Sequence, residues 1–352
     1  MRDTAGHVII GAEPFSHIWK IRVMKVIIPT AGLGTRLRPH TYTKPKPLVS
    51  VAGKPVLGHI LDTLSQIEID ELIFITGYLG NQIEEYVQEN YPFPARFIEQ
   101  TELKGQAHAI YLAREVVSGP TLILYVDTIF DADLRQLKQI DADGVIYVRQ
   151  VDDPRRFGVT FIENGYITKL IEKPDSGISN LAMIGLYYVR DAQRLIQAIE
   201  TMMERNIQTK GEFYLTDALQ IMIDDGARFI ADPVAVWEDC GTKETVLRTN
   251  RYLLDHGRAH IGPVEGSIVI PPVYIDDSAR VVNSIVGPYV SIAAGAMVRD
   301  SIVRDSIINQ DALIESTTIQ NSLVGDNALV QGDFRELNVG DASEIRFGRM
   351  KS

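Results

Sequence analysis

The chain has 352 residues, of which 45% are hydrophobic and 23% charged, and its formal net charge is −11. The length predicts two domains with a core each, and the acidic balance argues against nucleic-acid or membrane-surface partners. A single cysteine, Cys240, excludes an intrachain disulfide and fits the reducing cytoplasm. The sequence holds no apolar run of about 18 residues, so no transmembrane helix is expected.

Residues 1–23 read as an N-terminal extension. The apolar run His7–Ala12 is too short for the core of a signal peptide, and acidic residues lie on both sides of it. Met24 stands directly at the first convincing strand. We therefore expect residues 1–23 to lie outside the catalytic fold.

A glycine-rich loop follows the first apolar run, Val26–Ile28, which predicts a buried parallel strand. Gly32 and Gly34 allow a sharp turn that leaves backbone N–H groups uncovered, and such a turn can form a nest for phosphate oxygens. Arg36 and Lys46 add positive charge in a stretch without any Asp or Glu. This pattern indicates a site for a nucleoside triphosphate.

From Met24 to about His260, apolar runs alternate with amphipathic stretches. This alternation predicts an α/β fold with a Rossmann-like, mostly parallel sheet covered on both faces. The strands that we expect are 26–29, 72–76, 95–99, 121–126 and 144–149. The helices that we expect are 56–66, 80–89, 105–117 and 192–205. Ligands of such sheets bind beyond the carboxyl ends of the strands, where the glycine-rich loop also lies.

Two aspartates follow apolar stretches and are candidate metal ligands. Asp127 ends the run Leu122–Val126, and Asp239 follows Val234–Trp237. Magnesium prefers hard carboxylate oxygens, although an isolated aspartate at such a place is more often a turn or helix-capping residue. We expect Asp127 and Asp239 to hold Mg²⁺ because the phosphate loop accompanies them.

After about Gly266, Ile, Val and Leu recur at steps of about six residues. Amphipathic helices do not have this period, and strands joined by long loops would not keep it. It predicts a left-handed parallel β-helix of roughly four coils over 266–333, with a C-terminal tail at 334–352. The domains expected are thus the extension, a catalytic domain over 24–260, the β-helix and the tail.

The order of the motifs resembles that of sugar-1-phosphate nucleotidylyltransferases, and is most similar to the glucose-1-phosphate thymidylyltransferases. The resemblance covers residues 24–250. The segments that carry it are Gly32–Arg36, Lys44–Leu48, Gln100 with Gly105, Tyr125–Phe130, Phe157–Val159, Ile171–Pro174, Asn180–Tyr187, Lys210–Asp217 and Trp237–Thr242. It implies a nucleotidyltransferase fold and an enzyme that condenses a nucleoside triphosphate with a hexose 1-phosphate, giving an NDP-sugar and pyrophosphate.

The resemblance also implies a role for each matching residue. Arg36, Lys46 and Lys173 would be catalytic: the first two stabilise phosphate charge, and Lys173 binds the phosphate of the sugar. The nucleotide would be bound by the loop and the base-reading pair, which are Ala31, Gly32, Gly34, Thr35, Arg36, Gln100 and Gly105. The sugar phosphate would be bound by Gly158, Glu172, Lys173, Gly185 and Tyr187. Asp127 and Asp239 would hold Mg²⁺.

The base and the sugar stay open at this stage. The carboxamide of Gln100 offers one donor and one acceptor, which match uracil or thymine but also an adenine edge. The resemblance favours dTTP and glucose 1-phosphate, with UTP or GTP as alternatives. The chain departs from the family pattern at Val126, Gln106, His108 and Phe157, and Lys210 stands where an Arg is common.

Two other classes of protein compete with this interpretation. Many hexapeptide-repeat proteins are acyltransferases, but no His follows His260 to act as their general base. A catalytically silent subunit that binds an NDP-sugar is the second alternative, although it would be expected to lose Arg36, Lys46, Asp127 or Asp239. We expect a cytoplasmic enzyme that forms homo-oligomers, with a nucleoside triphosphate and a sugar 1-phosphate as its partners and no nucleic-acid or membrane partner.

Overall fold

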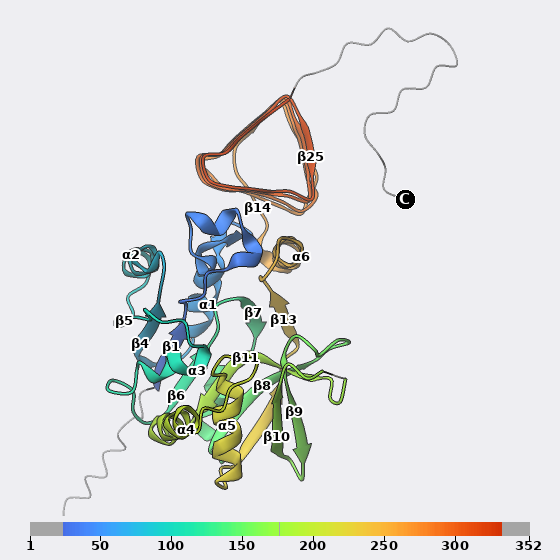
Figure 1. Cartoon of the computed structure of the whole chain (residues 1–352). Helices are drawn as coiled ribbons and strands as arrows, with labels where there is room; N and C mark the ends of the chain where they lie inside the picture. The colour runs from blue at the N-terminus through green and yellow to red at the C-terminus, as the bar shows by residue number, and fades with distance from the viewer. Residues whose placement is uncertain (1–23, 176, 333–352) are drawn as a thin grey trace, which may run out of the picture.

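The computed structural model describes residues 24–175 and 177–332. The expectations for residues 1–23 and 334–352 therefore lie outside the described residues. Figure 1 shows an α/β region with a separate triangular stack of strands above it. None of the helices in the described ranges is long and apolar enough to cross a membrane.

A nine-stranded sheet forms the centre of the α/β region. Seven of its strands follow the order β10-β9-β11-β6-β1-β4-β5, while β8 pairs with β11 and β12 pairs with β8. Its strands are β1 (Met24–Pro29), β4 (Ile69–Thr76), β5 (Ala95–Glu99), β6 (Thr121–Leu124), β8 (Gly144–Gln150), β9 (Gly158–Glu163), β10 (Tyr166–Glu172), β11 (Leu181–Val189) and β12 (Phe229–Pro233). The pairs around β1 are parallel, whereas β11 runs antiparallel to β6, β8 and β9. The expected α/β class is confirmed, and the sheet is mixed.

Helices cover both faces of this sheet. They are α1 (Val56–Leu64), α2 (Gly80–Asn90), α3 (Gln106–Tyr111), α4 (Ala192–Glu204) and α5 (Leu215–Asp224). A sixth helix, α6 (Lys243–Leu253), lies beside the prism and contacts β13 (Val236–Asp239). Side chains of α1, α2 and α6 share one apolar cluster with Ile28, and those of α3, α4 and α5 share another with Ile27. Since neighbouring strand residues point to opposite faces, β1 contributes to both cores.

Several elements differ from the sequence-based expectation. The strand expected at 121–126 ends at Leu124, and the helix expected at 105–117 is only Gln106–Tyr111. Residues 125–127 leave the sheet and lead into β7 (Thr128–Asp131), which pairs with β13 (Val236–Asp239). This departure separates Asp127 from its strand and brings it next to the segment that carries Asp239.

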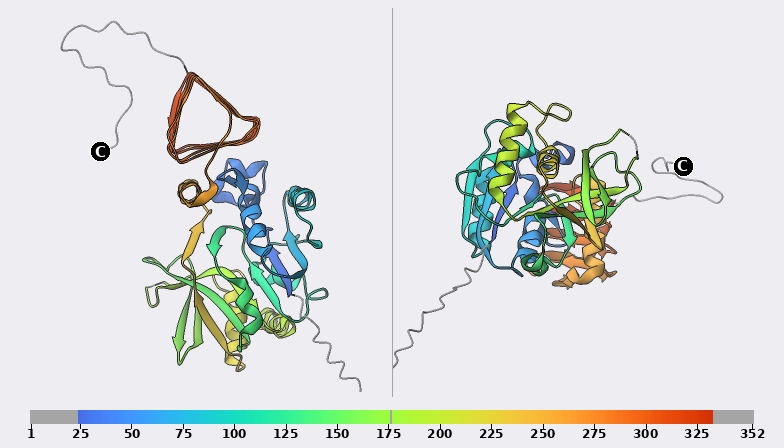
Figure 2. Two further views of the ribbon diagram at one scale, coloured as in Figure 1. Left: turned by 180° about the vertical axis from the view of Figure 1, so that it is seen from behind. Right: turned by 90° about the horizontal axis from the view of Figure 1, so that it is seen from below.

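Three parallel sheets form the C-terminal stack, and they fit a left-handed β-helix. Figures 1 and 2 show them as the sides of a triangular prism. One side holds β14 (His260–Ile261), β17 (Val273–Ile275), β20 (Val290–Ile292), β23 (Ile307–Ile308) and β26 (Leu323–Val324). The second holds β15 (Val264–Glu265), β18 (Arg280–Val282), β21 (Met297–Arg299), β24 (Leu313–Glu315) and β27 (Leu329–Gln331). The third holds β16 (Ile268–Val269), β19 (Ile285–Val286), β22 (Ile302–Arg304) and β25 (Thr318–Gln320).

The interior of the prism is apolar, with Val273, Val290 and Ile292 fully buried in one cluster. A ladder of hydroxyl groups also links consecutive coils. The backbone N–H of Ser284 donates to Ser267 Oγ, and that of Ser301 donates to Ser284 Oγ. Each coil therefore satisfies polar backbone groups of the next, as a solenoid requires.

The prism and the α/β region contact each other directly through α6. The carboxamide oxygen of Asn250, a fully buried residue, accepts hydrogen bonds from the backbone of Ala52 (2.9 Å) and from Ser291 Oγ (2.6 Å). Arg251 forms an ion pair with Asp305 at the edge of the same contact. This contact joins α6 to both the N-terminal half of the chain and the prism.

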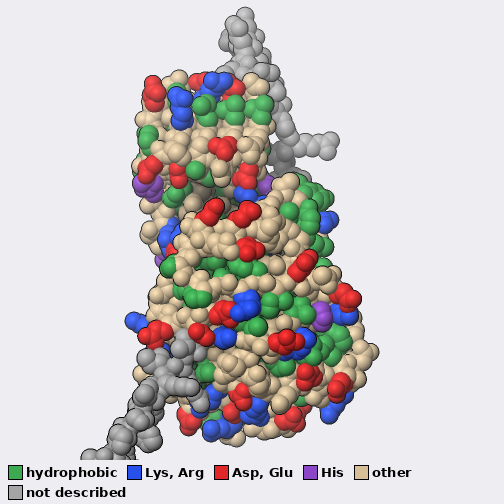
Figure 3. Space-filling view, turned by 90° about the vertical axis from the view of Figure 1, so that its left-hand side faces the viewer, with side chains coloured by type: hydrophobic (Ala, Val, Ile, Leu, Met, Phe, Trp, Pro, Cys, Tyr) green, Lys and Arg blue, Asp and Glu red, His purple; other side chains and the backbone are tan. Residues whose placement is uncertain are grey.

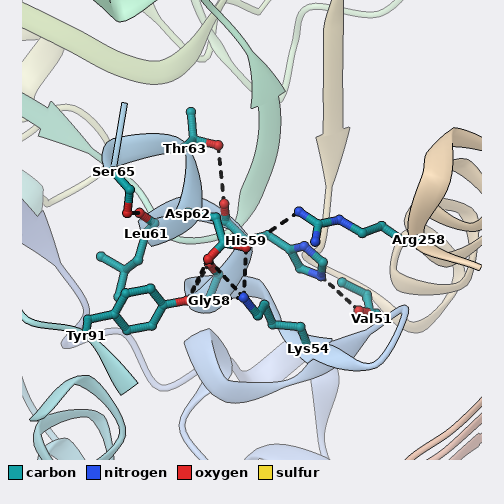
Figure 4. A network of polar contacts seen from close by, with 10 residues as sticks. All are labelled: Val51, Lys54, Gly58, His59, Leu61, Asp62, Thr63, Ser65, Tyr91 and Arg258. Carbon is teal, nitrogen blue, oxygen red and sulfur yellow. Dashed lines mark hydrogen bonds and ion pairs between the residues drawn. The ribbon is translucent and has the colours of Figure 1, made fainter. Parts of the chain in front are cut away.

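A polar network lies where the chain leaves the α/β region for the prism (Figure 4). The carboxylate of Asp62 on α1 receives Lys54 Nζ at 2.8 Å, Tyr91 OH at 3.1 Å and the guanidinium of Arg258 at 3.5 Å. His59 is buried beside it and contacts the carbonyl of Val51 at 2.9 Å. Burial lowers the pKa of His59 to about 4, so it stays neutral and has a structural role.

Candidate active site

Two adjoining cavities open at the carboxyl ends of β1 and β6. The larger, of about 420 Å³, is lined by residues 29–35, Lys46, Gln100 and Gly105. The smaller, of about 220 Å³, is lined by Arg36, residues 156–158, Glu172, Lys173, Gly185, Tyr187, Trp237 and Asp239. Gln106, Tyr125 and Asp127 line both cavities. A ligand in one cavity and a ligand in the other would meet at these three residues.

The glycine-rich loop forms one wall of the larger cavity. Gly34 has φ +60°, and a Cβ there would lie only 2.9 Å from Lys46 Cβ, so this position needs a glycine. Gly32 has open space around it. Thr41 Oγ1 donates to the carbonyl of Gly34 at 2.9 Å and holds the loop closed behind the cavity. Gly32 and Gly34 therefore place no side chain between the loop backbone and the cavity, which suits a phosphate ligand.

The two aspartates lie near each other because β7 pairs with β13. Asp239 stands opposite Thr128 in this pair, and the backbone N–H of Cys240 donates to the carbonyl of Asp127 at 2.8 Å. Lys46 Nζ contacts Asp127 Oδ2 at 2.9 Å. A Cβ on Gly241 would lie 3.0 Å from Arg36 Nη2 and 2.8 Å from Asp239 Oδ1, so both side chains pack against this glycine.

The carboxylate pair fits a magnesium ion, because Mg²⁺ in phosphate sites takes one or two carboxylates and completes its shell with phosphate oxygens and water. Asp127 and Asp239 offer hard oxygen donors to the same cavity. No group of three or more His, Cys, Asp or Glu side chains suited to a metal occurs within 24–175 and 177–332. A dedicated all-protein metal cage is thus absent from these ranges.

The smaller cavity contains a half-buried acid, Glu172, beside a lysine. Burial raises the pKa of Glu172, against the opposing effects of the hydrogen bond from Thr216 Oγ1 (2.6 Å) and the charge of Lys173. Lys173 has a positive φ of 45° and lies over the ring of Tyr214, whose hydroxyl it contacts. Tyr214 thus holds the ammonium group of Lys173, which lines the smaller cavity.

Glycines give the smaller cavity its shape. A Cβ on Gly158 would lie 2.0 Å from Met183 Cε and 2.8 Å from Glu172 Oε2. Gly185 has φ +85°, and a Cβ there would lie 2.9 Å from the ring of Tyr125. The ring of Tyr187 is buried edge-on to Tyr125, at 6.0 Å between centroids.

The structure brings the predicted site residues to these two cavities, but sequence reasoning missed two of their walls. Tyr125 separates the cavities and donates its hydroxyl to Gln106 Oε1 at 3.0 Å. Trp237 packs edge-on against Phe157, and its indole N–H is buried without a partner among the described residues. Both residues belong to motifs that the sequence analysis singled out, and this could have identified them as site residues.

Cys240 is buried and lines neither cavity. Burial raises the pKa of its thiol to about 12, so Cys240 is a packing residue.

Comparisons with known proteins identify relatives of this chain. The Nucleotidyl transferase family matches residues 25–256. A glucose-1-phosphate thymidylyltransferase of Streptomyces griseus is 30% identical over 86% of this chain and 92% of its own length. The bifunctional protein GlmU of Methanocaldococcus jannaschii is 33% identical over 73% of this chain, but only 61% of its own length is matched. The low-salt glycan biosynthesis nucleotidyltransferase Agl11 of Haloferax volcanii is 30% identical over 92% of this chain and all of its own length.

Solved structures share the fold of the α/β region. A Bacillus anthracis protein with a provisional assignment as a glucose-1-phosphate thymidylyltransferase, solved with sucrose, superposes with a TM-score of 0.58 at 26% identity. It covers 68% of this chain and 98% of its own. A UDP-glucose pyrophosphorylase solved with UDP-glucose has a TM-score of 0.56 at 21% identity, over 66% of this chain and 99% of its own.

Proposed function

Because the chain belongs to the nucleotidyl transferase family, we propose that it condenses dTTP with glucose 1-phosphate to give dTDP-glucose and pyrophosphate. The observation that carries the proposal is the pair of cavities that meet at Asp127. One has a backbone wall suited to a triphosphate, and the other has an acid and a lysine suited to a sugar phosphate. The thymidylyltransferase name of a relative matched over almost its whole length supports the choice of dTTP and glucose.

The reaction is an in-line displacement at the α-phosphorus of the nucleotide. An oxygen of the sugar phosphate forms the new P–O bond, the bond to the β-phosphate breaks, and pyrophosphate leaves with the electron pair. Lys173 would hold the sugar phosphate, and Arg36 and Lys46 would stabilise charge on the α-phosphate and the leaving group. Magnesium, when bound by Asp127 and Asp239, neutralises phosphate charge. No covalent enzyme intermediate is needed.

The sugar would be recognised mainly by hydrogen bonds. Glu172 accepts from Thr216 with one oxygen, and its carboxylate can accept further bonds from sugar hydroxyl groups. Gly158, Gly185 and Tyr187 would leave room for the ring. The loop from Ala31 to Thr35 would hold the β- and γ-phosphates through backbone N–H groups.

The remaining expectations belong to this proposal as well. They are a catalytic domain over 24–260, a β-helix over 266–333, a cytoplasmic location and a homo-oligomer. On the face shown in Figure 3, acidic and basic side chains are interspersed and form no continuous basic patch of the kind that binds a nucleic acid.

A substrate panel tests the proposal directly. Purified protein is incubated with Mg²⁺, one of five nucleoside triphosphates (dTTP, UTP, GTP, ATP or CTP) and one of four sugar 1-phosphates (glucose, galactose, mannose or N-acetylglucosamine). Release of pyrophosphate is then recorded. We expect the highest kcat/KM for dTTP with glucose 1-phosphate. Another best pair would correct the substrates within the family, and no release with any pair would favour a catalytically silent subunit.

A further inference from the structure

The side chain of Gln100 is held in one orientation at the back of the larger cavity. Gln100 directly follows β5 and is 6% exposed. Its Nε2 lies 3.3 Å from the carbonyl of Gly105 and 3.0 Å from Nδ1 of His108. A backbone carbonyl can only accept a hydrogen bond, so the NH₂ end of the amide must face Gly105.

His108 completes this arrangement from α3. With an NH₂ donor next to it, the Nδ1 of His108 accepts, and the neutral ring carries its proton on Nε2. Both N–H groups of the Gln100 amide are thus engaged within the protein. The atom that the amide leaves for a ligand is Oε1, which is an acceptor.

We propose that His108 is a specificity-determining positioning residue, which fixes Gln100 so that it accepts a hydrogen bond from the ring N–H of the nucleotide base. This inference rests on the proposed function and deepens it. It identifies the base as one with an imino N–H, such as the N3–H of thymine or uracil. The N3 of cytosine and the N1 of adenine carry a lone pair instead of a proton. Each would place a hydrogen-bond acceptor opposite Oε1, which is also an acceptor, so no hydrogen bond could form.

The backbone that carries His108 is held in place at the start of α3. Gly105 has φ +113°, and a Cβ there would lie 2.6 Å from the carbonyl of Phe213. The backbone N–H of Ala107 donates to that carbonyl at 2.9 Å, and the N–H of Phe213 donates to Lys104 at 3.0 Å. The segment around Phe213 and the residue Lys104 therefore hold the start of α3 in place, and the backbone of this turn cannot move with the ligand without breaking these bonds.

The charge state of His108 supports the same role. Burial lowers its pKa, the charge of Lys104 lowers it further, and Glu102 opposes both. The ring is therefore neutral at neutral pH and keeps a lone pair on Nδ1 for the amide. Without His108, the Gln100 amide could rotate and present either its NH₂ group or its oxygen to a base. The hydrogen bond to Nδ1 of His108 fixes the oxygen toward the base, so the amide becomes selective for a donor.

The test compares His108→Leu, which removes the acceptor, with His108→Asn, whose carboxamide oxygen can replace Nδ1. Tyr111→Phe is the matched control, because Tyr111 lies on the same helix but bonds to Glu200 rather than lining the cavity. Binding of dTTP, UTP and CTP with Mg²⁺ is measured by calorimetry without any sugar phosphate. The ratio of kcat/KM for the same nucleotides is measured alongside.

We expect the wild-type protein to bind dTTP and UTP about 100-fold more tightly than CTP, since an unpaired or opposed acceptor is costly. His108→Leu should narrow this ratio about 10-fold or more, without changing KM for the sugar phosphate. His108→Asn and Tyr111→Phe should keep it. Equal binding of CTP and UTP by the wild type, or an unchanged ratio in His108→Leu, would overturn the inference. Selective binding without any pyrophosphate release would instead reject the proposed function and leave the inference standing.

Discussion

The α/β region and the prism bury their side chains in different ways. This difference explains why the cavities of the candidate active site lie in the α/β region, whereas the prism has a regular, repeated interior. In the prism, the coils from Val273 onward repeat their inward apolar positions, and serine hydroxyl groups link successive coils. In the α/β region, strands of unequal length end in loops that carry an acid, lysines and glycines into two cavities. A regular repeat satisfies its polar groups locally, whereas the ends of a sheet leave charged groups available for ligands.

The two regions also meet at residues 40–44, which extend the glycine-rich loop toward Lys46. Lys44 pairs with Asp326 of the prism at 2.5 Å, and the ring of His40 faces Gly325. On its other side, the loop is held by Tyr78 OH and Gln82 Nε2, which donate to the carbonyls of Tyr42 and Thr43. The prism thus supports the loop that carries Arg36 and Lys46, without contributing a residue to either cavity.

The largest effect should come from Asp127→Asn, which leaves the fold intact but removes a carboxylate from the junction of the cavities. We expect kcat to fall about 100- to 1,000-fold, with an unchanged melting temperature, because the ion pair with Lys46 is partly exposed. Asp131→Asn, at the exposed end of β7, the strand that follows Asp127, is the control. Near-normal turnover in Asp127→Asn would reject its assignment as a metal ligand.

The prism should respond in the opposite way. Ile292→Ala empties a fully buried position in β20 and should lower the free energy of unfolding by about 2–5 kcal/mol, measured by urea denaturation. Turnover at low temperature should stay normal. Ile268→Ala changes an exposed side chain of the same prism. It should leave both the free energy of unfolding and the turnover unchanged. Loss of turnover in a folded Ile292→Ala protein would show that the comparison between the two regions is wrong.

Glu172→Gln should separate activity from stability within the α/β region. We expect KM for the sugar phosphate to rise about 10- to 100-fold, because hydrogen bonds to a charged acceptor are lost. Since the folded protein raises the pKa of Glu172, the ionised group destabilises the fold above its unfolded pKa. The variant should therefore melt at a higher temperature than the wild type at pH 7.5. This gain should shrink as the pH falls toward 4.5.

Glu163→Gln is the matched control for this prediction, because Glu163 is an exposed acid at the end of β9. Its melting temperature and its KM for the sugar phosphate should equal those of the wild type at each pH. A Glu172→Gln variant that melts below the wild type at pH 7.5 would show that the ionised carboxylate stabilises the fold.

The smallest effect should come from the support that the prism gives to the glycine-rich loop. Asp326→Asn removes the ion pair with Lys44 and should raise KM for the nucleotide about 2- to 5-fold, in line with an exposed ion pair. Asp305→Asn removes the ion pair with Arg251, which joins the same two regions at α6. It should leave KM unchanged. Equal effects of the two substitutions would mean that the prism does not act through the loop.

Much of the fold could be predicted because its signals are local. The bounds of β5 agree with the prediction at both ends, and α1, α2 and α4 begin where expected. Helix α5 was missed, because its apolar residues follow a motif that reads as a loop. Within the described residues, the sides of the prism hold five, five and four strands, and β14 and β15 lie before residue 266, where the clear repeat was expected to begin.

The sequence by itself determined the α/β class, the solenoid and the order of the site motifs, because period, glycine placement and motif spacing are properties of neighbouring residues. Only the tertiary structure decided how the site residues meet. The pairing of β7 with β13 places Asp127 beside the segment of Asp239, and the approach of α3 places His108 against Gln100. Such contacts depend on packing between distant segments, so the orientation of an amide, and with it the choice of base, could not be read from the chain.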